Sequence, residues 1–489
     1  MVTLIIRRFE LLFVMGAVLW IAGCGSSSNP TTVTGVSVTC LPSAIQSSQL
    51  LQCSTTVYGT GTFSTMVNWT ATTGSITSAG VYTAPVVSSP ATATITAVSQ
   101  ETASQMGTAT VTIYPVNLQS LTVDAGPQPQ TFTAVNEAFT SVTVCVPGTN
   151  TCQTINHILV DTGSSGLRLL WSVLTVPLPP QNDSSGNPLD ECQLLLRGYA
   201  WGPVASADVV LAGEKASSAA VQVIIPSNDS PPVPDTCSSR TTGPNQGNSV
   251  SALGANGVLG VGLFQKDCGT ACTTSNGSIP PIYYDCPASG CNPTYVTLAQ
   301  QVPNPVTMLS YDNNGVMLYL PAVPAGGLTT VNGSLIFGVG TQANNALQSA
   351  TVYTVPDSGA NMGQIMTTFN GVNYPGTIDS GSPGILFLDS ATTNIPTCTV
   401  QGSTWYCPTT SPDSLLATNQ GANGNQGVVN FSIESANTLL NSGNSAFSTL
   451  GGPQTGSFDF GLPFFFGRNV FTAIENMSTP AGPGPYFAY

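Results

Sequence analysis

Charged side chains are scarce in this sequence of 489 residues, where Asp, Glu, Lys and Arg together make up 6%. Only 8 residues are Lys or Arg, against 22 Asp or Glu, so the formal net charge is −14. Because nucleic-acid binding needs a basic patch, we expect no nucleic-acid partner. Long helical patterns are also rare, while Gly numbers 50 and Pro 37. This composition favours an all-β protein outside the cytoplasm.

Histidine occurs once, at His157. A serine or cysteine triad would have to use this residue, but it begins the apolar run into Asp161 and is better explained as structural. The P-loop, GxGxxG and HExxH motifs are absent from the sequence. We therefore expect no cofactor and no catalytic metal.

Two similar stretches stand out, ILVDTGSSGLRLL at residues 158–170 and GTIDSGSPGILFL at residues 376–388. Each places Asp-Thr/Ser-Gly-Ser between two apolar runs. Each predicts a buried strand, a tight turn that holds one carboxylate, and a second strand that leaves the turn. Only a fold that brings two similar lobes together could make Asp161 and Asp379 neighbours.

The residues after each aspartate have predictable roles. The first offers a hydroxyl that can tie the two turns together, the glycine allows a sharp turn, and the serine can donate a hydrogen bond to the carboxylate. The six supporting residues are Thr162, Gly163, Ser164, Ser380, Gly381 and Ser382.

A third Asp-Ser-Gly, at residues 357–359, serves as a control. Such sequences are common in ordinary turns. This copy lacks flanking apolar strands, and we interpret it as a simple turn.

The twin turns are the arrangement of the pepsin-like aspartic peptidases, and the chain resembles this family over about residues 137–489. Residues 256–262 and 458–475 resemble the apolar-apolar-Gly strands that pass beside the two catalytic loops, the second followed by a helix. Residues 333–341 resemble the strand that opens the second lobe.

The resemblance implies an all-β fold of two lobes with a central cleft, an N-terminal lobe at residues 137–315 and a C-terminal lobe at 316–489. It implies that Asp161 and Asp379 share one proton and activate a water to hydrolyse peptide bonds. The expected activity is that of an aspartic endopeptidase acting on a peptide or protein. The alternative is a catalytically silent binding or structural protein of the cell envelope.

Residues 198–202 resemble the pepsin flap, the hairpin that closes over substrate. Tyr199 would take the place of the flap tyrosine, with Trp201 beside it at the substrate. Arg168 replaces the tryptophan that the family usually bonds to that tyrosine, so we expect its charge near the flap. Asp459, in the closing strand, also departs from the family pattern.

Residues 1–24 resemble a bacterial lipoprotein signal peptide, with two Arg before an apolar run that ends Ile-Ala-Gly-Cys. Cleavage would leave Cys24 as a lipidated N-terminus on a flexible tether, residues 25–32. An ordinary secretory signal is the alternative. Since Gly25 rather than Asp follows the cysteine, we expect an outer-membrane lipoprotein that faces the periplasm or the exterior.

Short alternating strands in residues 33–115 predict a β-sandwich that resembles bacterial immunoglobulin-like domains. We expect this domain to act as a spacer, joined to the two lobes by a linker at residues 116–136. We expect a monomer.

The sequence holds 13 cysteines, and lipidation of Cys24 would leave an even number for six disulfides in an oxidising compartment. Zinc is the rival explanation for the cysteine cluster at residues 268–291, but His157 is far from that cluster in sequence. The expected pairs are Cys40 with Cys53, Cys145 with Cys152, Cys192 with Cys237, and Cys398 with Cys407. The sequence does not fix the pairing of Cys268, Cys272, Cys286 and Cys291.

Overall fold

The computed structural model describes residues 31–87, 89–128, 133–183, 185–195, 198–226, 231–241, 247–274, 280–410 and 413–489. The expected signal peptide, the lipidation site Cys24 and most of the tether lie outside these residues. Within them, no helix combines the length and apolar character needed to cross a membrane. The chain divides into two compact units. The first holds most of residues up to 111, and the second holds residues 112–489 with the short segments 45–48 and 85–91.

Two four-stranded sheets form the N-terminal part, in the orders β1-β3-β6-β5 and β2-β8-β7-β4. Burial alternates along β7, where Ala93, Ile95 and Ala97 are fully buried, as expected for strands with one face in a core. The strands are β1 (Thr32–Cys40), β2 (Ala44–Gln46), β3 (Leu50–Thr60), β4 (Val67–Ala71), β5 (Ser75–Ile76), β6 (Val81–Thr83), β7 (Ala91–Ser99) and β8 (Met106–Tyr114). The immunoglobulin-like character of this part stays a prediction.

The largest sheet of the second unit has the order β18-β17-β13-β14-β15-β12-β16-β11-β10-β9-β20-β19-β31-β34-β21. It continues past the predicted lobe boundary, which stays a prediction. Its strands are β9 (Leu118–Val123), β10 (Ala138–Cys145), β11 (Cys152–Asp161), β12 (Ser165–Leu170), β13 (Leu189–Leu195), β14 (Gly198–Leu211), β15 (Glu214–Ile224), β16 (Gly257–Val261), β17 (Tyr283–Asp285), β18 (Asn292–Thr294), β19 (Gly315–Leu320), β20 (Val331–Phe337), β21 (Val352–Thr354), β31 (Arg468–Ala473) and β34 (Tyr486–Ala488).

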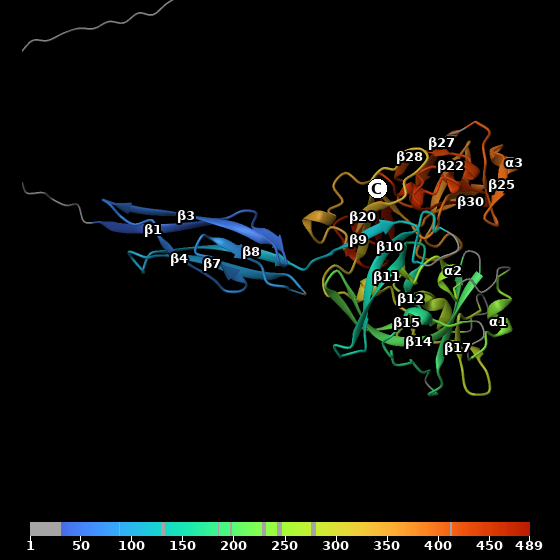
Figure 1. Cartoon of the computed structure of the whole chain (residues 1–489), viewed down its shortest axis with the longest axis horizontal. Helices are drawn as coiled ribbons and strands as arrows, with labels where there is room; N and C mark the ends of the chain where they lie inside the picture. Colours follow the sequence, from blue (N-terminus) through green and yellow to red (C-terminus); the bar gives the residue numbers. More distant parts are fainter. Residues whose placement is uncertain are drawn as a thin grey trace, which may run out of the picture. The chain divides into compact units, whose positions relative to one another are not determined.

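A second sheet of this unit has the order β28-β27-β22-β23-β30-β24-β29. Figure 1 shows its strands β22, β27, β28 and β30 in orange and red, apart from the green strands β12, β14 and β15 of the first lobe. The strands are β22 (Ile365–Phe369), β23 (Val372–Ile378), β24 (Ile385–Leu388), β27 (Asp413–Gln420), β28 (Gln426–Ile433), β29 (Gly451–Gly452) and β30 (Gln454–Phe460). Two small hairpins pair β25 (Thr397–Val400) with β26 (Ser403–Tyr406) and β32 (Ser478–Thr479) with β33 (Gly482–Pro483).

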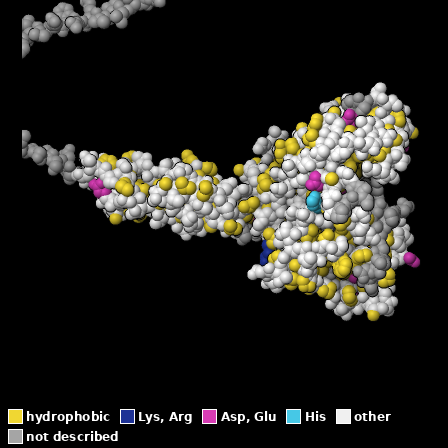
Figure 2. Space-filling model, viewed as in Figure 1, with side chains coloured by type: hydrophobic (Ala, Val, Ile, Leu, Met, Phe, Trp, Pro, Cys, Tyr) yellow, Lys and Arg dark blue, Asp and Glu magenta, His cyan; other side chains and the backbone are white. Residues whose placement is uncertain are grey.

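Helices are short throughout the described residues. The α-helices are α1 (Asp235–Ser238), α2 (Val250–Leu253), α3 (Ser390–Thr393) and α4 (Ala436–Leu440). The 3₁₀ turns are η1 (Trp171–Val173), η2 (Gly269–Cys272), η3 (Pro305–Met308), η4 (Ala343–Asn345) and η5 (Leu462–Phe464). The expected all-β class is confirmed. Figure 2 shows the sparse charged side chains as isolated spots on the surface.

The same strand arrangement surrounds both aspartate turns. Strand β16 lies between β11 and β12, parallel to β11 and antiparallel to β12, with Asp161 paired to Gly260. Strand β30 lies in the same way between β23 and β24. These pairings confirm that the two glycine-containing segments pass beside the turns, so the chain repeats one supporting motif.

The helix expected after β30 is wrong. The chain makes one 3₁₀ turn, η5, and then enters β31. Pro463 lies in the first turn of η5, where it is tolerated, but Gly467 follows with a positive φ of 78° and ends any helical path. The phenylalanines between them are buried in the core instead of lying along a helix.

Six disulfides are present, and the four expected pairs are confirmed. The open cluster resolves into two short loops, Cys268–Cys272 and Cys286–Cys291. Among the described residues, no group of three or more His, Cys, Asp or Glu side chains could hold a metal ion.

Candidate active site

The first turn holds the carboxylate of Asp161 at the end of β11. The Gly163 N–H donates to its Oδ1 over 2.7 Å, and the Ser164 hydroxyl donates to its Oδ2 over 2.5 Å. Hydrogen bonds of this kind fix the direction of a carboxyl group. The expected role of Ser164 as donor is therefore matched by the geometry.

The second turn repeats this pattern with one difference. The Gly381 N–H donates to Asp379 Oδ1 over 2.7 Å, and Ser382 Oγ lies 3.1 Å from Asp379 Oδ2. Ser382 Oγ also lies 2.6 Å from Oδ2 of Asp459, on the neighbouring strand β30. A third carboxyl thus adjoins the second turn.

Four hydrogen bonds tie the two turns together. The Thr162 N–H donates to Ser380 Oγ over 3.1 Å, and the Ser380 N–H donates to Thr162 Oγ1 over 2.9 Å. The Thr162 hydroxyl then donates to the Ile378 carbonyl, and the Ser380 hydroxyl to the Val160 carbonyl. Thr162 and Ser380 are buried, so these bonds are shielded from water. This reciprocal lock brings Asp161 and Asp379 together, as the twin motifs predict.

The two turn glycines are required by space rather than by backbone angle. Neither Gly163 nor Gly381 has a positive φ. A Cβ on Gly163 would lie 2.5 Å from Asp379 Cγ, and one on Gly381 would lie 2.7 Å from Asp161 Oδ1. Each glycine therefore lets the carboxyl of the opposite turn approach closely.

The two carboxyls are coupled. Burial raises the pKa of Asp379 well above its usual range, and the negative charges of Asp161 and Asp459 raise it further. A hydrogen bond with Asp161 adds to the rise in this pKa, while the Gly381 N–H opposes it. Two carboxyls so placed can share one proton.

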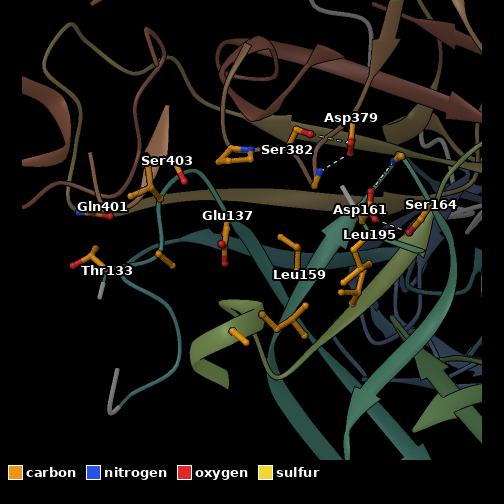
Figure 3. A pocket seen from close by; sticks show the side chains of 18 of the residues that line it. Thr133, Glu137, Leu159, Asp161, Ser164, Leu195, Asp379, Ser382, Gln401 and Ser403 are labelled. Carbon is orange, nitrogen blue, oxygen red and sulfur yellow. Dashed lines mark hydrogen bonds between the residues drawn. The ribbon is translucent and has the colours of Figure 1, made fainter. Parts of the chain in front are cut away.

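A cavity of about 720 Å³ opens over the pair. In Figure 3 the carboxyls of Asp161 and Asp379 face each other at one end, with Glu137 farther along the wall. Leu159, Leu195 and Val258 give the wall an apolar part. The polar part includes Gln193, Gln401 and Ser403.

Glu137 was not predicted as a site residue, because it belongs to no recognisable motif. Its side chain lines the cavity, and its Oε2 is buried with no hydrogen-bond partner. Burial raises the pKa of Glu137 to about 8. An acid set between the apolar residues Val135 and Phe139 is the only signal that could have found it.

Tyr199 and Trp201 do not lie where the flap resemblance placed them. Both are buried in a side cluster with Tyr284 and the Cys192–Cys237 disulfide, and neither lines the cavity. They are two positions apart on β14, so they share the face that is turned to this cluster. The cavity is lined instead by residues of the paired strand β13, Gln193 to Leu195.

The guanidinium of Arg168 lies near the flap hairpin, as expected, since its partners Glu191 and Gln193 are on β13, the strand paired with β14. Arg168 is 1% exposed, does not line the cavity, and pairs with Glu191 over 2.7 Å and with Asp267 over 3.3 Å. Its charge is therefore neutralised away from the dyad. A further bond of 2.8 Å runs from Arg168 to Oε1 of Gln193, so Arg168 connects the strand after the first turn to a side chain of the cavity wall.

The remaining site candidates lie outside the cavity. Nε2 of His157 lies 3.4 Å from Oδ2 of Asp124, and its ring contacts the Phe139 ring edge to face, in keeping with a structural role. The control turn at Asp357 is an exposed bend.

Comparison with known proteins gives a family and similar solved structures. The family model described as "Protein of unknown function (DUF3443)" matches residues 114–489. No curated protein matches the sequence. Among solved structures, the aspartic proteinase from Irpex lacteus is similar with a TM-score of 0.45 and 16% identity, over 76% of this chain and 96% of that chain.

Proposed function

The chain belongs to this family of proteins of unknown function (DUF3443), and we propose that it is an aspartic endopeptidase that hydrolyses peptide bonds with the Asp161–Asp379 dyad. The observation that carries the proposal is the reciprocal lock between the two turns, which holds two coupled carboxyls against each other at the wall of a cavity. A turn with a purely structural role has no need of an identical partner from a distant part of the chain.

The chemistry follows from the different surroundings of the two carboxyls. Asp379 keeps the shared proton, because burial and the charge of Asp161 raise its pKa. Asp161, held in place by the Gly163 N–H and the Ser164 hydroxyl, acts as the base. It takes a proton from a water molecule that attacks the substrate carbonyl, while Asp379 donates its proton to the carbonyl oxygen. A proton then passes to the leaving amine.

The cavity wall supports a peptide as the substrate. Leu159, Leu195 and Val258 offer apolar contact to side chains, and Gln193 offers polar groups to a peptide backbone. Gln193 is held by Arg168, so a bound chain would meet a fixed partner rather than a free side chain.

The cellular setting is a separate part of the proposal and depends on the sequence alone. The lipobox-like end of the signal peptide supports a lipid on Cys24, and with it anchoring to the outer membrane. The domain at residues 33–115 would then act as a spacer between the membrane and the peptidase, which we propose to be monomeric.

Incubation of the purified protein with an unfolded protein substrate tests the activity. The assay spans about pH 3 to 7, with and without a pepstatin-type inhibitor, since shared-proton catalysis needs one carboxyl ionised and one protonated. We expect hydrolysis that the inhibitor abolishes. If the substrate binds but no inhibitor-sensitive cleavage occurs at any pH, the protein is a binding protein that has kept the dyad without turnover.

A further inference from the structure

A third carboxyl, Asp459, lies behind the dyad on β30. Its strand neighbours are Thr377 on β23 and Leu386 on β24, neither of which carries a charge. The side chain is 4% exposed, and its Oδ1 is buried with no hydrogen-bond partner. Among the residues that the structure describes, no Lys, Arg or His forms an ion pair with it.

The hydroxyl of Ser382 connects this carboxyl to the dyad. Its Oγ lies 2.6 Å from Asp459 Oδ2 and 3.1 Å from Asp379 Oδ2. A serine hydroxyl has one proton and can donate to only one acceptor at a time. Two ionised carboxylates cannot both be satisfied, so both contacts are hydrogen bonds only if one of the two acids is protonated and donates to Ser382.

Asp459 is the acid that donates, because the proton that Asp379 holds is shared with Asp161 and is not directed to Ser382. The contact of Asp459 with Ser382 is the shorter one, and no cation compensates a negative charge at its buried position. Burial raises the pKa of Asp459 to about 7 and the charge of Asp161 adds to the rise, whereas hydrogen bonds with Ser382 and Thr377, which favour the ionised form, oppose it. The charged groups that face Asp459 are thus the two dyad carboxyls themselves.

We propose that Asp459 is a positioning residue of the site, a neutral acid that donates to Ser382 and thereby directs the Ser382 hydroxyl proton to Asp379. The role of Asp459 in catalysis rests on the proposed function. The protonation of Asp459 and the direction of the two hydrogen bonds of Ser382 are properties of the folded protein and do not depend on it. Asp459 donates its proton to Ser382, and Ser382 donates its own proton to Asp379. Each of these two donors therefore has one acceptor.

The same arrangement couples Asp459 to the titration of the dyad. Once Asp459 ionises, its negative charge disfavours loss of the shared proton, since the charge of Asp459 raises the pKa of Asp379. The dyad then keeps its proton to higher pH than it would beside a neutral residue. Removal of the Asp459 charge should lower the pH at which the shared proton is lost by on the order of one unit.

Infrared difference spectroscopy tests the proposal without any need for turnover. A protonated carboxylic acid has a carbonyl band that an ionised carboxylate lacks. We compare wild-type protein with Asp459→Asn at about pH 6, both labelled with ¹³C at aspartate carboxyls. We expect the wild type to have one protonated-acid band that the variant lacks, and Ser382→Ala to shift the frequency of that band. Asp357→Asn, at the exposed control turn, should leave it unchanged.

The titration of the dyad gives the second readout. The band that Asp379→Asn removes belongs to the shared proton, and it should vanish at lower pH in Asp459→Asn than in wild type. Asp459→Leu, which also lacks the charge, should show the same shift and serves as a second variant if Asp459→Asn folds poorly. The proposal is overturned if wild type and Asp459→Asn have the same bands at pH 6, or if the dyad band titrates at the same pH in both.

These outcomes separate the inference from the proposed function. Wild-type protein that shows the Asp459 band but cleaves no peptide contradicts the endopeptidase and leaves the neutral acid in place. Wild-type protein that cleaves peptides but lacks the band contradicts the inference alone.

Discussion

Replacement of Glu137 by Gln should stabilise the protein more strongly as the pH rises. The carboxyl of Glu137 has a pKa of about 8 in the folded protein, against an ordinary value of 4.5, because burial disfavours its charge. A carboxyl whose folded pKa is raised contributes its stability below the unfolded value and loses it as the pH rises through the folded value. Gln has the same shape but does not titrate, so the Glu137→Gln variant avoids this loss of stability as the pH rises.

The magnitude follows from the two pKa values. Between about pH 4.5 and 8 the wild type loses roughly 1.4 kcal/mol of unfolding free energy per pH unit relative to Glu137→Gln, about 5 kcal/mol in all. Because Glu137 lines the cavity and keeps some contact with water, this total is an upper limit, and we expect about half of it.

The assay is urea unfolding at five pH values between about 4 and 8, with the disulfides intact. The unfolding free energies of wild type and Glu137→Gln should coincide near pH 4 and separate steadily above it. Asp357→Asn changes an exposed carboxyl and should run parallel to wild type. If the unfolding free energy of Glu137→Gln also runs parallel to that of the wild type across this pH range, the reasoning that Glu137 is a buried, unpaired acid in the cavity wall is refuted.

Three further predictions concern other parts of the chain. Arg168→Met leaves the buried acids Glu191 and Asp267 without a cation and should lower the unfolding free energy by about 3–5 kcal/mol, measured by urea unfolding. A loss below about 1 kcal/mol would contradict this network. Gly163→Ala places a methyl group against Asp379 and should abolish binding of a pepstatin-type inhibitor, measured by calorimetry. Gly35→Ala is the control, because its methyl group would contact only one atom, at 3.7 Å, and this variant should bind the inhibitor as the wild type does. Cys24→Ser should release the protein from the membrane fraction or block its processing; unchanged membrane association would contradict the lipid anchor.

The paired turns could be predicted from sequence because each is a local pattern. An aspartate between two apolar runs specifies a strand, a turn and a strand, and two copies specify a pair of lobes. The strands β16 and β30 were found for the same reason, since an apolar run that ends in glycine is visible in the sequence. The control turn at Asp357 was interpreted correctly because it lacks flanking apolar strands.

The parts that were misplaced depend on contacts between distant segments. Tyr199 lies close in sequence to the tip of the β13–β14 hairpin, but which face of β14 meets the cavity is set by the packing of Trp201 against Tyr284. Arg168 lies near the flap hairpin as expected, but its acidic partners, Glu191 and Asp267, could not be identified before the strands were placed. Asp459 was noticed as unusual, but only the pairing of β30 with β23 and β24 brings it to Ser382.

The most direct test of the central claim is peptide hydrolysis by the two single dyad variants, Asp161→Asn and Asp379→Asn. An amide keeps the shape of the side chain but cannot exchange the shared proton, and loss of such acid–base catalysis typically costs about 10²–10⁴-fold in rate. We measure the initial rate of substrate cleavage at the pH optimum, and thermal unfolding for each variant. The account predicts that each variant loses at least this factor with thermal stability unchanged or raised, while Asp357→Asn keeps wild-type activity. Cleavage that persists at the wild-type rate in both dyad variants would contradict it.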